Sequence, residues 1–329
     1  MRRAAAKPKL IIVGDDFGVN RFRTDGLVEA FISRPAAISN VAMLVNGHDT
    51  DRAAKLAKQW SIPTGLHFNV TEGRPISDPA KIPSLTNDGL FLGKEKAFRL
   101  LHSASPAVLE EVAVECRAQI ERCGKLLERS VKHFDGHHHI HVLPSVWQSL
   151  EPVLLSCGIQ SVRIPADAVY QGSSTMEGPP ELDSSNLHGE PFWQLVTMWS
   201  KCILQTSPAI RSQQLYTTPA FIGIDLSFNV SKERLQSRLQ SAVSSCRNSG
   251  REPVIEVMAH IGHPARSDVA AVEEAYKWCY DAFSASEDRE MERILYCGSA
   301  EELRRSYDVI TFEAAARQAT LRKQLKSRL

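Results

Sequence analysis

Short apolar runs alternate with longer amphipathic segments along most of this chain, which indicates parallel β-α-β units. Some seven such units favour a closed (β/α) barrel, seven-stranded or irregular, over an open doubly wound sheet. No GxGxxG follows the first apolar run, so the dinucleotide-binding fingerprint is missing. The apolar runs predict strands over 9–13, 39–44, 64–70, 132–139, 161–164, 221–226 and 253–259. The amphipathic segments predict helices over 24–32, 51–59, 107–127, 145–156, 231–245, 267–283 and 312–329.

Two segments interrupt this alternation. Residues 72–96 are rich in Pro, Gly and Asp and are predicted to be a loop. Residues 167–218 start with a Gly/Ser/Pro-rich stretch and are interpreted as an insertion near the site, with a helix over 192–204. We therefore expect a single α/β barrel domain over 1–329, with this insertion and a C-terminal helix, 312–329, that packs across a barrel end. The insertion carries aromatic rings that suit either stacking on sugars or packing on the barrel: Tyr170, Phe192, Trp193 and Trp199.

Composition and charge limit which binding partners and which cellular compartment we expect. A net charge of +1 gives no reason to expect nucleic acid or an anionic membrane as a partner. The seven cysteines are scattered without a CxxC pair, which argues against a disulfide framework and indicates a reducing compartment. No apolar run approaches the ~18–20 residues of a membrane span. Residues 1–7 are faintly like a transit peptide, but the first strand follows too soon for a cleavable leader. We expect a cytoplasmic protein.

A histidine tract at 133–141 is the most unusual feature of the sequence. It holds five of the eleven histidines, around Asp135. If the tract is a strand, one face carries the side chains of His133, Asp135, His137, His139 and His141. Imidazole is the commonest metal ligand, so this face predicts a functional site rather than ordinary core. A surface tract or capping histidines at a turn are the plain alternatives.

Carboxylates and imidazoles follow three further predicted strands. Asp15 and Asp16 end the first, His67 lies near the end of the third, and both His260 and His263 follow the last. In (β/α) barrels the chemistry lies at these carboxyl ends. A carboxylate with two imidazoles leaves coordination positions open for water, as in hydrolytic metal centres, and spare carboxylate and imidazole groups can act as base and acid. No GxSxG, P-loop or HExxH motif offers another chemistry.

In combination, four motifs resemble the YdjC-like carbohydrate deacetylases: Asp-Asp-Phe-Gly at 15–18, Gly-Leu-His-Phe at 65–68, the tract at 133–141, and Glu-Val-Met-Ala-His at 256–260. The resemblance runs from about residue 9 to 265. It implies a TIM-like barrel related to polysaccharide deacetylases and a magnesium-dependent hydrolase that acts on the linear amide of N-acetylated amino sugars or their oligosaccharides. By the same resemblance Asp16, His67 and His137 are the metal ligands, Asp15 is the base and His260 the acid.

Several alternatives stay open. Ile261 stands where the family usually has proline, so His263 competes with His260 as the acid. Arg163, at the end of the fifth strand, is expected to bind a sugar hydroxyl or to orient Asp15, unless it is a surface arginine. Ligand chemistry alone suits zinc, manganese or cobalt as well as magnesium. A metal-dependent phosphoesterase, another amidohydrolase and a non-catalytic sugar- or metal-binding protein are the alternative functions. The natural sugar, N- versus O-acetyl preference and oligomeric state are not predicted.

Overall fold

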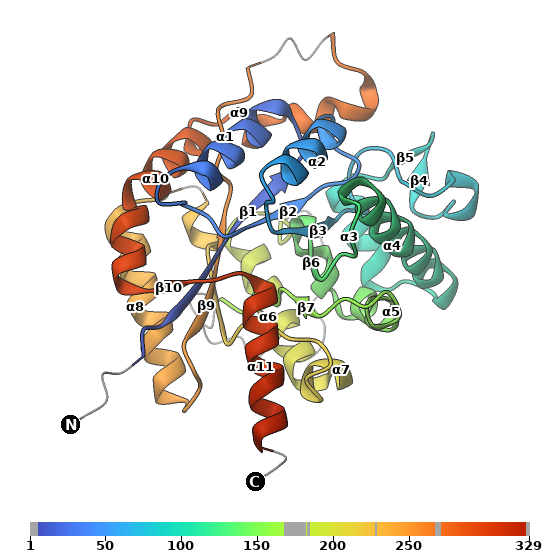
Figure 1. Ribbon diagram of the computed structural model, residues 1–329. Coiled ribbons are helices and arrows are strands. Elements are labelled where there is room, and N and C mark those ends of the chain that lie inside the picture. Colours follow the sequence, from blue (N-terminus) through green and yellow to red (C-terminus); the bar gives the residue numbers. More distant parts are fainter. Residues whose placement is uncertain (1–5, 168–181, 183–184, 228, 267–270, 327–329) are drawn as a thin grey trace, which may run out of the picture.

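The computed structural model describes residues 6–167, 182, 185–227, 229–266 and 271–326. Its centre is a parallel sheet in the order β7-β6-β3-β2-β1-β9-β8, with β10 (Asp308–Val309) paired to the start of β1. Isolated parallel bridges, Ser161 to Tyr216 and Asp167 to Phe221, join its two edges. The predicted seven-stranded, irregular (β/α) barrel is therefore confirmed (Figure 1). The seven strands are β1 (Lys9–Phe17), β2 (Asn40–Met43), β3 (Thr64–Phe68), β6 (His133–Gly136), β7 (Ser161–Val162), β8 (Ala220–Ile222) and β9 (Val254–Ala259).

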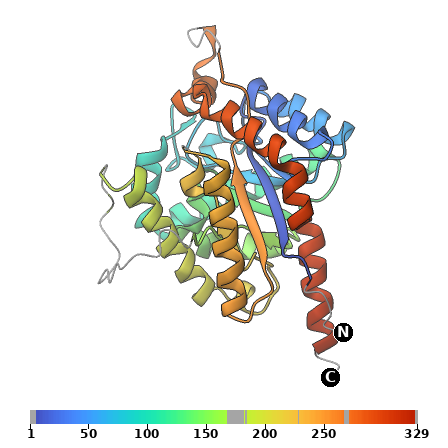
Figure 2. The same cartoon turned by 90° about the vertical axis from the view of Figure 1, so that its left-hand side faces the viewer.

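Helices surround the sheet, and their ends follow from local sequence. Asn20 caps the first by accepting the backbone N–H of Arg23, and Ser105 caps the fourth, just before Pro106. Figure 2 shows β1 and β9 side by side between α8 and α10. No helix in the described residues combines the length and apolar composition that crossing a bilayer requires. The helices are α1 (Arg21–Ile32), α2 (Thr50–Gln59), α3 (Lys94–His102), α4 (Pro106–Leu127), α5 (Pro144–Ser156), α6 (Gly189–Thr206), α7 (Pro208–Arg211), α8 (Lys232–Asn248), α9 (Ala282–Ala285), α10 (Asp288–Ser306) and α11 (Phe312–Lys326).

The two unusual segments are more structured than the sequence indicated. The predicted loop over 72–96 contains a 3₁₀ turn, Pro79–Lys81, and a small hairpin of β4 (Thr86–Asn87) and β5 (Leu90–Phe91). The helix predicted over 192–204 is confirmed as α6. Tyr170 and most of the Gly/Ser/Pro-rich stretch lie outside the described residues.

The C-terminal helix α11 packs across the end of the barrel opposite the predicted site, as expected. The ring of Phe312 stacks on His133 at the start of β6, and Ala315 packs with Ile11 and Val13 of β1. His133 therefore lies at the amino ends of the strands, where it is part of the packing of α11.

The helix predicted over 267–283 is wrong for the described part of that range. Residues 274–280 form a 3₁₀ segment, and the helix that completes the last β-α unit is α10, which begins at Asp288. The sequence did not reveal α10 because two charged residues, Arg289 and Glu292, occupy its buried face as an ion pair of 3.1 Å. Apolar periodicity is a weak signal for a helix whose inward face starts with charged residues, and here only the later positions Tyr296, Ala300 and Leu303 are apolar.

Candidate functional site

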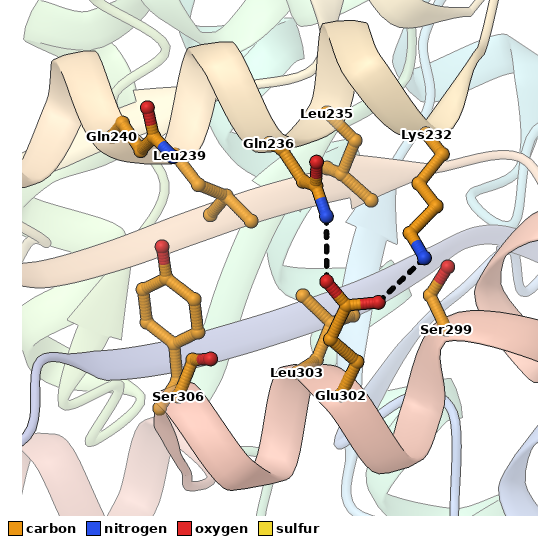
Figure 3. Close-up of a pocket in the computed structure, with 10 residues that line it drawn as sticks. Lys232, Leu235, Gln236, Leu239, Gln240, Ser299, Glu302, Leu303 and Ser306 are labelled. Carbon is orange, nitrogen blue, oxygen red and sulfur yellow. Dashed lines mark hydrogen bonds and ion pairs between the residues drawn. The ribbon is translucent and has the colours of Figure 1, made fainter.

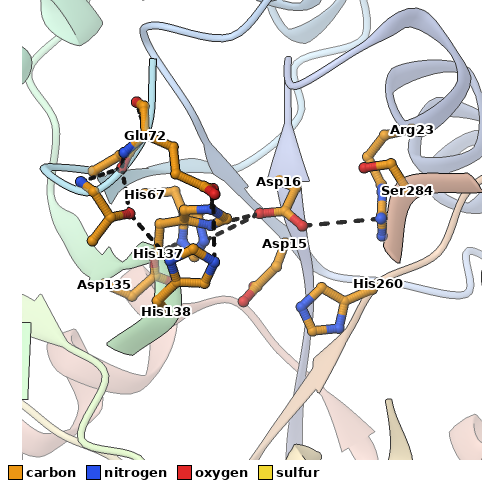
Figure 4. A network of polar contacts seen from close by, with 12 residues as sticks. Asp15, Asp16, Arg23, His67, Glu72, Asp135, His137, His138, His260 and Ser284 are labelled. Atoms are coloured by element: carbon orange, nitrogen blue, oxygen red, sulfur yellow. Dashed lines mark hydrogen bonds and ion pairs between the residues drawn. The ribbon is translucent and has the colours of Figure 1, made fainter. Parts of the chain in front are cut away.

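The predicted residues come together at the carboxyl ends of the strands. Asp15 and Asp16 belong to β1 and His67 to β3, whereas His137 directly follows β6 and His260 directly follows β9. The register between β1 and β2 shifts between Gly14 and Phe17, and Asp16 has a left-handed φ of 62°. Such an irregularity re-aims a side chain, here toward the histidines. Figure 4 shows His67 and His137 on one side of Asp16 and His260 on the other.

Asp16, His67 and His137 form a cluster with the geometry of a metal site. Asp16 Oδ1 lies 3.4 Å from His67 Nε2 and 3.2 Å from His137 Nδ1. The ligand atoms of the three residues lie within 4.8 Å of one another. Asp16 Oδ1 is buried and has no hydrogen-bond partner among the described residues. A divalent cation satisfies an orphaned carboxylate oxygen that faces two imidazole nitrogens, so the donor set fits a metal.

The second nitrogen of each imidazole is held by a further carboxylate. His67 Nδ1 lies 2.6 Å from Asp135 Oδ1, and His137 Nε2 lies 3.1 Å from Glu72 Oε2. Histidine ligands usually donate their other N–H to such a group, which fixes the tautomer and leaves a lone pair for the metal. No motif or periodicity in the sequence points to Glu72, which follows β3 in a loop. Asp135 could have been inferred, since it lies two residues before His137 in the tract.

These carboxylates also set the protonation of the metal-free imidazoles. Burial alone would lower the pKa of His67, but Asp135, Asp16 and Asp15 raise it to about 10. Burial likewise opposes protonation of His137, and the nearby carboxylates of Asp16 and Glu72 raise its pKa to about 9. A cation that binds here must therefore displace protons.

The alternation predicted for the histidine tract is wrong beyond Gly136. Residues 137–142 form a 3₁₀ segment in which His138 and His139 have left-handed φ values of 53° and 56°. His139 and His141 are consequently buried away from the metal cluster, and burial lowers the pKa of His141 to about 4. His138 stays near the cluster, with Nδ1 3.1 Å from Thr71 Oγ1. The strand ends because the backbone turns at His138, which spacing alone does not reveal.

Arg163 lies beneath the cluster and contacts three carboxylates. Its guanidinium donates to Asp15 at 2.6 and 2.8 Å and to Glu256 at 2.5 Å, and lies 3.1 Å from Asp135. Burial by itself would lower the pKa of Arg163, but these carboxylates raise it well above its usual value. The side chain is 0% exposed, so the surface alternative is wrong. Its contacts favour orientation of Asp15 over direct contact with a sugar.

Desolvation raises the pKa of Asp15, although Arg163 and His67 act in the opposite direction. The carboxylate is 1% exposed and adjoins Asp16, a predicted metal ligand, in sequence. A desolvated carboxylate with a raised pKa is a stronger proton acceptor than one in water. Asp15 thus has the properties expected of a general base.

The two candidate acids have different surroundings. His260 is partly exposed beside the two aspartates, and burial together with Arg289 and Arg23 holds its pKa well below the usual range. Ser227 Oγ lies 3.2 Å from its Nδ1. His263 is tied instead between α1 and α10, where its nitrogens lie 3.1 Å from Glu29 and 3.1 Å from Glu290. This arrangement favours His260 over His263 as the group that meets a substrate.

A separate pocket of about 170 Å³ lies between α8 and α10 (Figure 3). Glu302 spans it through contacts with Lys232 and Gln236, both at 2.6 Å. The pocket is formed by outer helices and contains no histidine. Its walls therefore offer none of the chemistry gathered at the strand ends.

Comparison with known proteins agrees with this geometry. A carbohydrate deacetylase of Mus musculus is 32% identical over 295 residues, covering 87% of this chain and 87% of its own length. A chitooligosaccharide deacetylase of Escherichia fergusonii is 33% identical over 185 residues, covering 56% of this chain and 69% of its own. A crystal structure of an Enterococcus faecalis V583 protein superposes with a TM-score of 0.60 at 20% identity, covering 94% of this chain and 99% of that one, which supports the fold. The family model described as YdjC-like protein matches residues 9–304, so this chain belongs to the YdjC-like family.

Proposed function

We propose that this protein is a metal-dependent carbohydrate deacetylase that hydrolyses the acetyl group of N-acetylated amino sugars or their oligosaccharides. The observation that carries the proposal is the convergence of Asp16, His67 and His137 beside Asp15 and His260. The names of the mouse and bacterial relatives support the carbohydrate substrate class.

Asp16, His67 and His137 would hold the cation. When bound, a divalent ion at this position polarises an acyl carbonyl and lowers the pKa of water from 15.7 toward about 7. Asp15, oriented by Arg163, accepts the proton of the attacking water. His260 donates a proton to the departing nitrogen, so that the amide gives a carboxylate and a free amine. His67 and His137 keep their lone pairs on the metal side because each donates its other ring N–H to a carboxylate, that of Asp135 and of Glu72 respectively.

Magnesium is the ion that we propose from the family resemblance, although two imidazole ligands equally suit zinc, manganese or cobalt. A cytoplasmic location likewise stays a prediction from composition.

A two-metal phosphoesterase has less support. Glu72, His137 and His138 form a second group of ligand atoms within 4.8 Å, but this group shares His137 with the first. The paired ions of such enzymes lie ~3.5–4 Å apart, whereas the opposite nitrogens of one imidazole point away from each other. We therefore regard Glu72 as the partner of a metal ligand.

The proposal is tested by acetate release from N-acetylated and O-acetylated mono- and oligosaccharides, with elemental analysis of the purified protein. We expect acetate from N-acetylated sugars, loss of activity with a chelator, and recovery on addition of a divalent ion. Sugar phosphates serve as the comparison substrates. Phosphate release from them without acetate release from any sugar would refute deacetylation.

A further inference from the structure

Within the described residues, the side-chain group that hydrogen-bonds to the imidazole of His260 is a serine hydroxyl. Ser227 follows the 3₁₀ turn Ile224–Leu226 after β8 and is 5% exposed. Its Oγ lies 3.2 Å from His260 Nδ1 and 3.1 Å from the carbonyl oxygen of Gly223. The side chains thus link the carboxyl ends of two neighbouring strands, β8 and β9.

The single proton of the serine hydroxyl determines the tautomer of His260. A carbonyl oxygen can only accept, so the Ser227 hydroxyl donates its proton to Gly223. The hydroxyl oxygen can then only accept from the imidazole, which requires a proton on His260 Nδ1. In the neutral ring, Nε2 carries the lone pair.

Residues of helix α10 hydrogen-bond to the backbone of both Ser227 and His260. Arg289 is 0% exposed and donates to the backbone carbonyl of Ser227 at 2.5 Å and to that of His260 at 3.4 Å. Glu292 accepts the backbone N–H of His260 at 2.6 Å. The ring of Phe283 lies edge-on to the imidazole, with centroids 5.0 Å apart. Backbone and ring are therefore both constrained, as a positioned catalytic group requires.

Gly223 allows the close approach on which this arrangement depends. Its φ is +136°, and an added Cβ would lie 2.6 Å from the carbonyl oxygen of Met258 in β9. A side chain here would push the 3₁₀ turn, and Ser227 with it, away from β9.

We propose that Ser227 is the positioning residue of His260, holding it as the Nδ1–H tautomer so that Nε2 alone carries the transferred proton. The catalytic consequence rests on the proposed function; the tautomer does not. During hydrolysis Nε2 takes up a proton from solvent and passes it to the departing nitrogen, while the Nδ1 proton stays on the imidazole and remains hydrogen-bonded to Ser227 Oγ.

The tautomer is measured by nitrogen NMR of the full chain labelled with ¹⁵N-histidine, with the signals of His260 assigned by comparison with His260→Gln. We expect protonated Nδ1 and unprotonated Nε2 in the parent, and a shift toward the other tautomer in Ser227→Ala. A parent protein with protonated Nε2, or an unchanged tautomer in Ser227→Ala, would overturn the proposal. Neither outcome depends on which substrate the enzyme uses.

The kinetic arm uses Ser227→Ala, Ser227→Thr and a control, Ser39→Ala. Ser39 is also buried, and its hydroxyl contacts the backbone of Ile12 in β1. We expect kcat to fall roughly 3- to 10-fold in Ser227→Ala, the scale of one hydrogen bond, with KM and metal content unchanged and partial recovery in Ser227→Thr. Ser39→Ala should lose stability without loss of kcat. Equal kcat in Ser227→Ala and the parent would refute a positioning role, whereas a parent inactive on every acetylated sugar would refute the proposed function alone.

Discussion

Arg163 holds Asp15 through two parallel hydrogen bonds, from Nη1 to Oδ2 at 2.6 Å and from Nη2 to Oδ1 at 2.8 Å. The same guanidinium lies 3.1 Å from Asp135, the partner of the proposed metal ligand His67. The buried guanidinium of Arg163 thus links the proposed base to the candidate metal site. A bidentate pair of this kind fixes orientation as well as charge.

Arg163→Met should lower the free energy of unfolding by about 3–5 kcal/mol, because it leaves buried carboxylates without their cation. Urea unfolding measures the loss. We also expect kcat to fall at constant KM, since the side chain is fully buried. A variant with normal stability and a raised KM would instead identify Arg163 as a residue that contacts the sugar.

Asp15→Asn should retain the metal while kcat falls by ~10²-fold or more, the usual contribution of a general base. The amide keeps a similar shape but cannot accept the proton. Metal content by elemental analysis and steady-state kinetics decide the result. Loss of the metal in this variant would make Asp15 a ligand and contradict its role as the base.

Variants of the candidate metal site should lose metal affinity to different degrees. His137→Ala should abolish metal binding with the fold retained, and Glu72→Gln should weaken it by about 10- to 100-fold, because Glu72 orients His137. Isothermal titration calorimetry with the ion measures the metal affinity of both variants. Glu301→Gln is the matched control, since this exposed glutamate pairs with Arg305 on the surface of α10. Parent-like affinity in His137→Ala would show that the ligands are assigned wrongly.

The metal-free protein should lose stability as the pH rises. The folded pKa values of His67 and His137, about 10 and about 9, lie above the unfolded value of 6.5. Their contribution is therefore complete below pH 6.5 and is lost as the pH rises through 9 to 10. A bound cation reverses the trend, because it needs the deprotonated imidazoles. Melting temperatures between pH 6 and 9, with chelator and with excess ion, should slope in opposite directions; parallel slopes would contradict the prediction.

Helix α6 carries two tryptophans with different surroundings, so their variants distinguish a substrate contact from a packing role. Trp199 is 3% exposed and stacks on Phe98, whereas Trp193 is only partly buried, with its ring 5.9 Å from Lys94 Nζ and 6.2 Å from His139. Trp193→Ala should raise KM for an oligosaccharide more than for a monosaccharide. Trp199→Ala should lower the melting temperature and affect both substrates alike. The same pattern for both variants would make Trp193 a packing residue.

The sequence was sufficient for the barrel and for the residues that meet at its carboxyl edge. Strand ends can be located from apolar runs, and a parallel barrel brings all such ends to one side. Asp16, His67 and His137 could thus be placed together without coordinates. The resemblance of the four motifs then selected their roles, which spacing alone leaves open.

Only the tertiary structure decided what surrounds these residues. Glu72 and Ser227 come from loops, and Arg289 from the charged start of the inward face of α10, so no apolar period marks them. The turn at His138 moves His139 and His141 into the core, although strand alternation groups them with His137. Local sequence specifies where a strand can run, but the partner of a buried polar atom is determined by whichever distant segment the fold brings within hydrogen-bonding distance.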